Sequence, residues 1–229
     1  MQVVSCEDVA VGTRKLPVTA FLPEAPKGAA AIFHGYSGCK EEMLGLGARV
    51  ARSGLATYVA DLAGHGENQS TFDEAVLAEA RALAASLARH GKVVAIGHSF
   101  GGRVASLCGT DFFIGLSPGL AAQYQTQTHE KRNFLRHYRV RGGSHQALFR
   151  LLSNLPVREF SPADAESSLI LCGSRDLPDV LAPCREIAEH GVPLVIVDKA
   201  MHGDIFTHPE TFRILSETLS RWFPDPASK

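Results

Sequence analysis

The sequence lacks several features that mark whole classes of protein. No uninterrupted apolar run approaches the roughly 18 residues that a membrane-spanning helix needs. The first residues contain neither a basic stretch nor an apolar one, so we expect no secretory signal and a cytoplasmic location. The formal net charge is only −1, which argues against nucleic acid or an anionic membrane as a partner of the whole protein.

Cysteine and metal-binding patterns are also sparse. The five cysteines are odd in number and scattered without a C-x-x-C pair, so reduced thiols are expected rather than a disulfide framework. Cys39 is the one thiol to test for reactivity, because it lies near a glycine-rich loop. Spacing such as H-E-x-x-H is absent, so neither a metal nor an organic cofactor is implied. The remaining composition, with 45% hydrophobic residues in 229, indicates a single globular domain over residues 1–229.

Short apolar runs alternate with segments of helical periodicity along most of the chain. Residues 2–22 predict two antiparallel strands joined near Gly12. Further strands are expected at residues 29–33, 55–60, 93–96, 111–116, 169–173 and 193–197, and helices at residues 40–52, 72–90, 103–108, 178–190 and 207–223. This alternation predicts an α/β fold, a mostly parallel sheet with helices on both faces.

The sequence Gly97-His98-Ser99-Phe100-Gly101 follows one of these buried strands and precedes a helix. G-x-S-x-G in this setting is typical of a nucleophilic serine on a strained turn, whose glycines let neighbouring backbone pass close by. The motif alone occurs by chance, and a glycine-rich turn with an incidental serine is the alternative. Chemistry in such sheets is found at the carboxyl ends of the strands, which is where this motif lies.

A serine hydroxyl needs a base, and the base needs a carboxylate behind it. Among the ten histidines, His202 follows the last predicted strand and fits the chain order serine, acid, histidine; a surface loop histidine is the alternative. Asp176, close after the preceding strand, is the preferred acid. Asp179 fits nearly as well, although an early helix position also suits helix capping, and Asp204 stays a further candidate.

Acyl transfer also needs N–H donors for the oxyanion. The backbone N–H of Phe100 is one candidate, because it follows Ser99 directly. The second candidate is the backbone N–H of Tyr36, in the glycine-rich loop at residues 34–38. His34 is expected to brace this loop rather than to ionise.

Together these motifs resemble the α/β-hydrolase superfamily over about residues 28–223. The residues that carry the resemblance are His34-Gly35-x-x-Gly38, Gly97-x-Ser99-x-Gly101, Gly173-x-x-Asp176 and His202, with a turn Asp61-x-x-Gly64-His65-Gly66 similar to its esterase, lipase and monoglyceride-lipase-like branches. The resemblance implies an eight-stranded sheet, a Ser–His–Asp triad and an acyl-enzyme mechanism. It implies a structural role for His65, while Asn68-Gln69-Ser70 lengthens the usual spacing there.

The superfamily often inserts a lid after the strand that follows the nucleophile helix, which here is about residues 118–165. This segment is rich in basic residues: Lys131, Arg132, Arg136, Arg139, Arg141, Arg150 and Arg158. One hypothesis is that the arginines bind an anionic substrate. The preferred hypothesis is a small helical lid whose arginines pair with the acidic remainder of the chain.

The function predicted from these residues is a serine esterase that cleaves carboxylic esters of a small molecule. Thioesterase or amidase chemistry on the same triad is the alternative, because pocket and lid select the leaving group. A non-catalytic binding protein of the same fold is a third possibility. The sequence does not indicate the oligomeric state.

Overall fold

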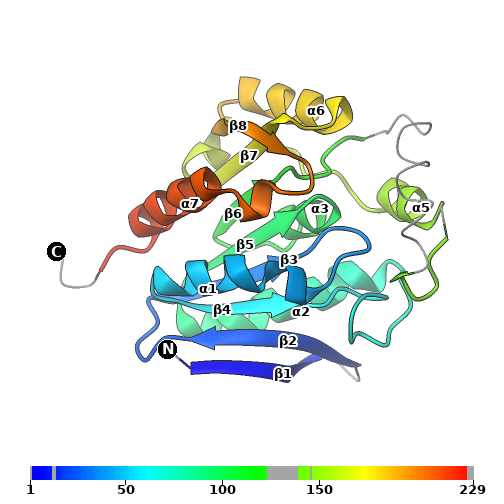
Figure 1. Ribbon diagram of the computed structural model, residues 1–229, viewed down its shortest axis with the longest axis vertical. Helices are drawn as coiled ribbons and strands as arrows, with labels where there is room; N and C mark the ends of the chain where they lie inside the picture. Colours follow the sequence, from blue (N-terminus) through cyan, green and yellow to red (C-terminus); the bar gives the residue numbers. More distant parts are fainter. Residues whose placement is uncertain (1, 12–13, 123–138, 145, 226–229) are drawn as a thin grey trace.

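A single twisted sheet organises the fold in this computed structural model, which describes residues 2–11, 14–122, 139–144 and 146–225. Its eight strands lie in the order β1-β2-β4-β3-β5-β6-β7-β8 (Figure 1). The strands are β1 (Gln2–Val11), β2 (Arg14–Leu22), β3 (Gly28–Phe33), β4 (Leu55–Ala60), β5 (Val93–His98), β6 (Phe112–Leu116), β7 (Ser168–Arg175) and β8 (Leu194–Met201). The pairs β1–β2 and β2–β4 are antiparallel and all others are parallel, which confirms the predicted sheet.

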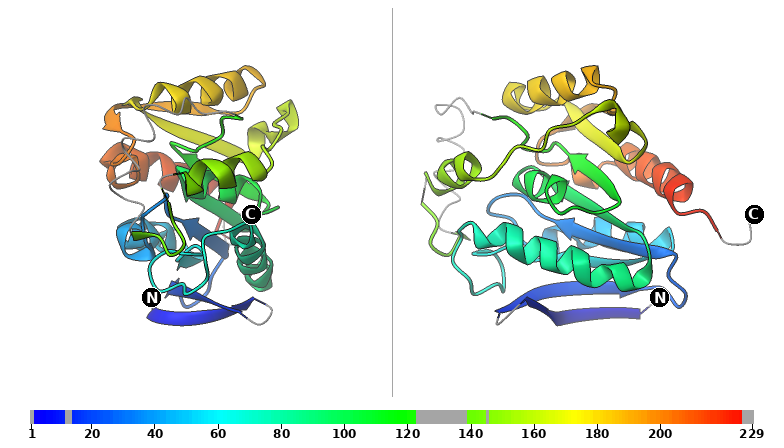
Figure 2. Two further views of the ribbon diagram at one scale, coloured as in Figure 1. Left: turned by 90° about the vertical axis from the view of Figure 1, so that its right-hand side faces the viewer. Right: turned by 180° about the vertical axis from the view of Figure 1, so that it is seen from behind.

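Helices cover both faces of the sheet, as Figure 2 shows from two further directions. One face packs against α1 (Leu44–Arg52) and α7 (Pro209–Trp222), and the other against α2 (Ala75–Leu87), α3 (Phe100–Ser106) and α6 (Pro178–Glu189). Each face has its own apolar core, and every residue of the central strands β3, β4 and β5 is buried. Burial on both faces explains why these strands are continuous apolar runs. Within the described residues, no helix is long and apolar enough to cross a membrane.

Short helical elements complete the chain: η1 (Lys40–Met43), η2 (Ala88–His90), η4 (Pro162–Glu166), η5 (Ile205–Thr207) and α5 (Ala147–Asn154). In Figure 1, α5 lies beyond the carboxyl ends of the parallel strands, at the right. The helix predicted at residues 40–52 consists of two elements, the 3₁₀ turn η1 followed by the α-helix α1. The helix predicted from residue 72 begins at Ala75, with Glu74 at its N-cap position.

Two strands near the site are longer than predicted. The strand β7 continues to Arg175, so Gly173 does not end it, and Asp176 is the first residue beyond the strand. The strand β8 continues to Met201, so His202 follows it directly. The apolar runs ended earlier because the last residues of both strands are largely exposed, and exposed strand residues carry no hydrophobic signal.

The predicted lid at 118–165 is described in part, since residues 123–138 and 145 lie outside the described residues. Lys131, Arg132 and Arg136 fall in that undescribed part. The described arginines all have partners in the chain: Arg139 pairs with Glu42 (3.3 Å), Arg158 with Asp164, Arg141 with the carbonyl of Asn68 (2.9 Å), and Arg150 with Oγ of Ser144 (3.1 Å). Only Arg139 pairs with an acidic residue outside the lid, as the preferred hypothesis predicts. Arg158 and Arg150 have their partners within the lid segment itself, and the partner of Arg141 is a neutral carbonyl.

Candidate active site

Ser99 lies on a sharp turn between β5 and α3. Its backbone has φ 53° and ψ −117°, a conformation that residues other than glycine rarely adopt. Such strained residues are found at functional turns, where the surrounding structure holds them in place. The chain crosses itself here: a Cβ on Gly97 would lie 2.1 Å from the carbonyl oxygen of Gly101. A Cβ on Gly101 would lie 2.3 Å from the carbonyl oxygen of His34. Both glycines are therefore required for the close approach that the motif predicts.

The structure brings Ser99, His202 and Asp176 into one hydrogen-bonded chain, although they lie on three separate loops. Nε2 of His202 is 2.9 Å from Oγ of Ser99, and Nδ1 of His202 is 2.9 Å from Oδ1 of Asp176. An ionised carboxylate only accepts, so Nδ1 carries the proton and Nε2 is free to accept the serine proton. The arrangement has the geometry of a nucleophile, a base and an orienting acid.

The carboxylate of Asp176 is held by donors on each of its oxygens. The hydroxyl of Ser117 donates to Oδ2, and the N–H of Leu177 donates to Oδ1 at 2.7 Å. Burial alone would raise the pKa of Asp176, but the hydrogen bond and charge of His202, with the Ser117 hydroxyl and the Leu177 N–H, hold it below its usual value. Asp176 is therefore a carboxylate at neutral pH.

The two other candidate acids have different positions. Asp179 lies in the first turn of α6, where a carboxylate complements the helix dipole. Asp204 accepts a hydrogen bond from the N–H of Met201 at 2.7 Å, which closes the turn around His202. The carboxylate that contacts the imidazole is thus Asp176.

The glycine-rich loop after β3 passes directly over Ser99. A Cβ on Gly35 would lie 3.4 Å from Cβ of Ser99, so the peptide that leads into Tyr36 lies beside the serine. The N–H of Phe100 lacks an intrahelical acceptor because Phe100 is the first residue of α3. The Tyr36 side chain points away, with its hydroxyl 3.4 Å from the carbonyl of Ser144, and burial raises its pKa to about 12.

Two neutral imidazoles fasten this loop to the loop after β4. Nε2 of His34 accepts from the N–H of Leu62 at 3.1 Å, and its Nδ1 donates to the carbonyl of the next residue at 2.7 Å. Nε2 of His65 accepts from the N–H of Ser37 at 2.9 Å, and its Nδ1 donates to a carbonyl of its own loop. Burial is the main cause that lowers the pKa of His34 to about 4 and of His65 to about 3. Both histidines brace the site, as predicted.

An ion cluster centred on the buried Lys40 and Asp61 supports the same loops, while its other members Glu41 and Glu67 are exposed. Nζ of Lys40 lies 2.9 Å from a carboxylate oxygen of Glu41, 2.9 Å from Asp61 and 2.6 Å from Glu67. Burial acts to lower the pKa of Lys40, but its hydrogen bonds to these carboxylates outweigh burial and raise it. The three carboxylates have the spacing of a metal site, yet the ammonium of Lys40 already supplies their positive charge. Gly66, at φ 51°, lets Asp61 approach.

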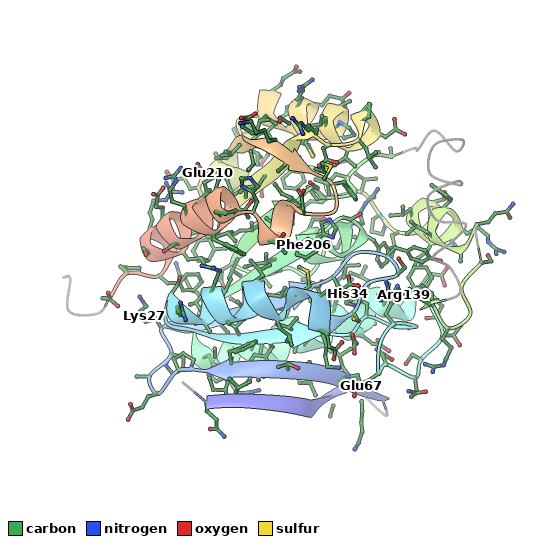
Figure 3. The ribbon with its side chains drawn as sticks, viewed as in Figure 1. Lys27, His34, Glu67, Arg139, Phe206 and Glu210 are labelled. Carbon is green, nitrogen blue, oxygen red and sulfur yellow. The ribbon has the colours of Figure 1, made fainter. Side chains whose placement is uncertain are left out.

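A cavity of about 380 Å³ adjoins the serine turn: Gly35 and His98, which flank Ser99, line it, whereas Ser99, His202 and Asp176 themselves do not. Its lining is mixed, with apolar side chains and one ion pair: Gly35, Tyr36, Gly38, Glu42, Met43, His98, Arg139, Gly203 and Phe206. Figure 3 shows His34 and Arg139 at the end of the sheet toward α5, whereas Lys27 lies at the opposite end. The cavity therefore lies at the carboxyl ends of the strands, where ligands bind in such sheets.

Comparison with known proteins agrees with this architecture. Residues 32–122 match the model of the Alpha/beta hydrolase family. Solved structures of similar fold include a carboxylesterase of the thaumarchaeon Nitrososphaera gargenis, with TM-score 0.72 and 15% identity over 94% of this chain and 98% of that one. An esterase of Thermogutta terrifontis, solved with malate bound, has TM-score 0.64 and 18% identity over 97% and 98%.

A third similar structure is a dienelactone hydrolase of Anabaena variabilis, with TM-score 0.63 and 20% identity over 97% of this chain and 96% of that one. The chain has the α/β-hydrolase fold. No curated protein sequence matches it. At these identities the likeness establishes the fold, and the chemistry must be argued from the site of this chain.

Sequence reasoning missed two residues of this α/β-hydrolase site. Ser117, at the end of β6, binds the carboxylate of Asp176, and its φ of 47° marks it as a constrained residue. His98, the residue before the nucleophile, donates from Nε2 to the backbone carbonyl of His202. The sequence could have indicated Ser117, because it directly follows a predicted parallel strand and so lies at the same edge of the sheet as the other site residues.

The structure also answers two expectations about the walls of the site, the reactivity of Cys39 and the longer spacing at residues 68–70. Burial and the neighbouring Glu41 raise the pKa of Cys39, so its half-buried thiol is a poor nucleophile rather than an activated one. The insertion at residues 68–70 is built into the wall: Nδ2 of Asn68 donates to the carbonyl of Asp61 and to Glu79, at 3.1 and 3.0 Å.

Proposed function

We propose that this protein is a serine hydrolase that cleaves carboxylic esters through an acyl-enzyme intermediate. The observation that carries the proposal is the unbroken hydrogen-bonded chain Asp176–His202–Ser99, in which the serine has a strained backbone conformation. A nucleophile within reach of a base, and a base oriented by a third group, form the recurrent arrangement for acyl transfer.

The reaction follows from the proton positions in this chain. Ser99 Oγ attacks the ester carbonyl carbon while its proton passes to Nε2 of His202. The resulting imidazolium returns that proton to the alkoxide leaving group, which departs as an alcohol and leaves Ser99 acylated. A water molecule then gives a proton to the same nitrogen as it attacks the acyl carbon. The second tetrahedral intermediate expels the Ser99 oxygen, which takes that proton back from Nε2 of His202, so the carboxylic acid is released and the Ser99 hydroxyl is restored. Asp176 keeps Nδ1 protonated throughout.

The oxyanion of each tetrahedral intermediate is assigned to the backbone N–H groups of Tyr36 and Phe100. The close approach of Gly35 to Ser99 and the position of Phe100 at the start of α3 support this assignment. A buried donor of this kind stabilises the transition state by about 2.7–4 kcal/mol. His34 and His65 keep the Tyr36 peptide rigid, so that it need not reorganise during the reaction.

The size of the cavity supports an ester of a small or medium-sized acid. A volume of about 380 Å³ lies at the low end for ligand pockets. The carboxylesterase and esterase among the similar structures support ester rather than amide chemistry. The turn from Asp61 to Gly66, which resembles the esterase, lipase and monoglyceride-lipase-like branches, also supports ester chemistry. Thioesters use the same machinery and remain the alternative substrate.

Labelling with a fluorophosphonate probe tests the proposal. The probe should label the wild type in proportion to enzyme and leave Ser99→Ala unlabelled, while circular dichroism shows that both are folded. Absence of labelling in folded wild-type protein would refute the proposal.

The acid is tested by a matched pair of substitutions in one segment. Asp176→Asn should lower kcat roughly 10⁴-fold, since the wrong imidazole tautomer is then favoured. Asp179→Asn should retain kcat within a few-fold. The reverse order would assign the acid to Asp179. Rates on matched p-nitrophenyl esters, thioesters and anilides of one acid then decide the leaving group.

A further inference from the structure

His98 lies between the nucleophile and the base and touches the loops of both. It is the residue directly before Ser99, and its Nε2 lies 2.7 Å from the carbonyl oxygen of His202. Its ring packs 5.1 Å from the ring of His202 and 4.8 Å from that of Phe206, measured between centroids. The side chain is 8% exposed.

The hydrogen bond fixes the protonation state of the ring. A carbonyl oxygen only accepts, so Nε2 of His98 carries the proton and, in the neutral ring, Nδ1 is unprotonated. Burial, with a smaller effect of His202, lowers the pKa of His98 to about 3. The ring therefore stays neutral at working pH, and it adds no positive charge next to the base.

This bond differs from the other bonds of the His202 turn. The N–H of Met201 donates to Oδ1 of Asp204, and the N–H of Asp204 donates to the carbonyl of Met201 at 3.3 Å. Those bonds close the turn on itself, but they do not set its position relative to Ser99. The bond from His98 does, because it joins the main chain of the base to the residue beside the nucleophile.

We infer that His98 is a positioning residue, which anchors the carbonyl of His202 to the serine turn and thereby keeps Nε2 of His202 within reach of Oγ of Ser99. The inference rests on the proposed function, since it concerns the same site. His202 is held at three points: by Asp176 at Nδ1, by Ser99 at Nε2 and by His98 at the main chain. A displacement of about 1 Å at a catalytic group can cost on the order of 100-fold in rate.

Three variants separate anchoring from packing. His98→Met has a similar volume but no donor. His98→Gln keeps an amide N–H at about the place of Nε2. His208→Met is the control, because His208 caps the start of α7 and lies outside the site. For each variant we would measure kcat and KM on p-nitrophenyl acetate, the fluorophosphonate labelling rate, the melting temperature, and amide hydrogen exchange of residues 201–207.

Anchoring predicts that His98→Met lowers kcat and the labelling rate about 10- to 100-fold, the factor for one hydrogen bond, with KM changed less than about three-fold. Hydrogen exchange at residues 201–207 should accelerate about ten-fold. His98→Gln should recover most of both effects, and His208→Met should retain the wild-type rate.

The inference is overturned if His98→Met labels and turns over like the wild type, or if Gln and Met are equally impaired and destabilised, which would indicate packing alone. Failure of the proposed function gives a different result, because the wild type itself would then not be labelled. In that case hydrogen exchange still decides whether His98 anchors the turn: faster exchange in Met but not in Gln supports the anchor, and equal exchange refutes it.

Discussion

Three buried neutral histidines should make the protein acid-sensitive. His34, His65 and His98 are 1%, 0% and 8% exposed, and burial is the main cause that lowers their pKa values to about 4, 3 and 3. In each ring, protonation would place a charge in the core, and in His34 and His65 it would also remove the acceptor of a backbone N–H. The folded state therefore excludes protons that the unfolded chain binds.

The sign and size of the effect follow from the linkage between proton binding and folding. Because the folded pKa values lie below the unfolded value of about 6.5, the stabilisation is complete above about pH 6.5 and is lost as the pH falls below it. Between pH 7 and pH 5 each histidine loses about 1.9 kcal/mol, which gives about 5–6 kcal/mol for the three. That loss is comparable to the whole stability of many domains.

Urea unfolding at several pH values between 7 and 5 measures this loss. The slope of the unfolding free energy against pH should correspond to an uptake of two to three protons on unfolding near pH 5.5. His65→Gln should reduce the uptake by about one proton, because the amide keeps a polar group but cannot titrate. Ser99→Ala serves as the control and should keep the wild-type slope. An unfolding free energy at pH 5 within about 1 kcal/mol of that at pH 7 would refute the reasoning.

Three further predictions concern the supports of the site. Lys40→Met should cost about 3–5 kcal/mol of unfolding free energy in urea, since the fully buried Asp61 would lose its cation; an unchanged midpoint would show that the cluster is not stabilising. Gly66→Ala should destabilise by more than about 1 kcal/mol, because its Cβ would lie 2.3 Å from the Asp61 carboxylate, whereas Gly45→Ala meets nothing within 4 Å and should stabilise by up to about 1 kcal/mol. Ser117→Ala should lower kcat about ten-fold at constant KM on p-nitrophenyl acetate; a change confined to KM would contradict it.

The sheet and the positions of the chemical groups could be predicted because both depend on local sequence. Buried parallel strands are continuous apolar runs, and Ser99, His202 and Asp176 each follow such a run at the same edge of the sheet. The predicted ends of helices and strands were wrong where tertiary contacts determine them. Phe72 fits the helical pattern, yet its N–H donates to the carbonyl of Arg141 and its ring packs against Phe100, so α2 begins later.

The sequence favours Asp176 as the acid but does not exclude Asp179, and the reason is geometric. The apolar run ends at Gly173, whereas β7 continues through exposed residues to Arg175 beside the equally exposed end of β8. A register irregularity between Gly173 and Arg175 sets where the strand releases the chain, and hence which carboxylate reaches His202. That irregularity depends on the pairing with β8, which no local pattern encodes.

The roles of the histidines show the same limit more sharply. His34, His65 and His98 act as neutral connectors, and in each one the tautomer is fixed by a carbonyl that accepts from one ring nitrogen. His202 differs because its Nδ1 faces a carboxylate and its Nε2 faces a hydroxyl, so the same ring can gain and lose a proton during a reaction. The residue type is identical in all four. The difference lies in what each ring nitrogen meets across the loops, and only the fold brings those partners together. Of the three neutral rings, His98 holds the main chain of His202, and His34 and His65 hold the loop that carries Tyr36. In the proposed reaction these fixed loops keep the groups in place while a proton moves between Ser99 and His202.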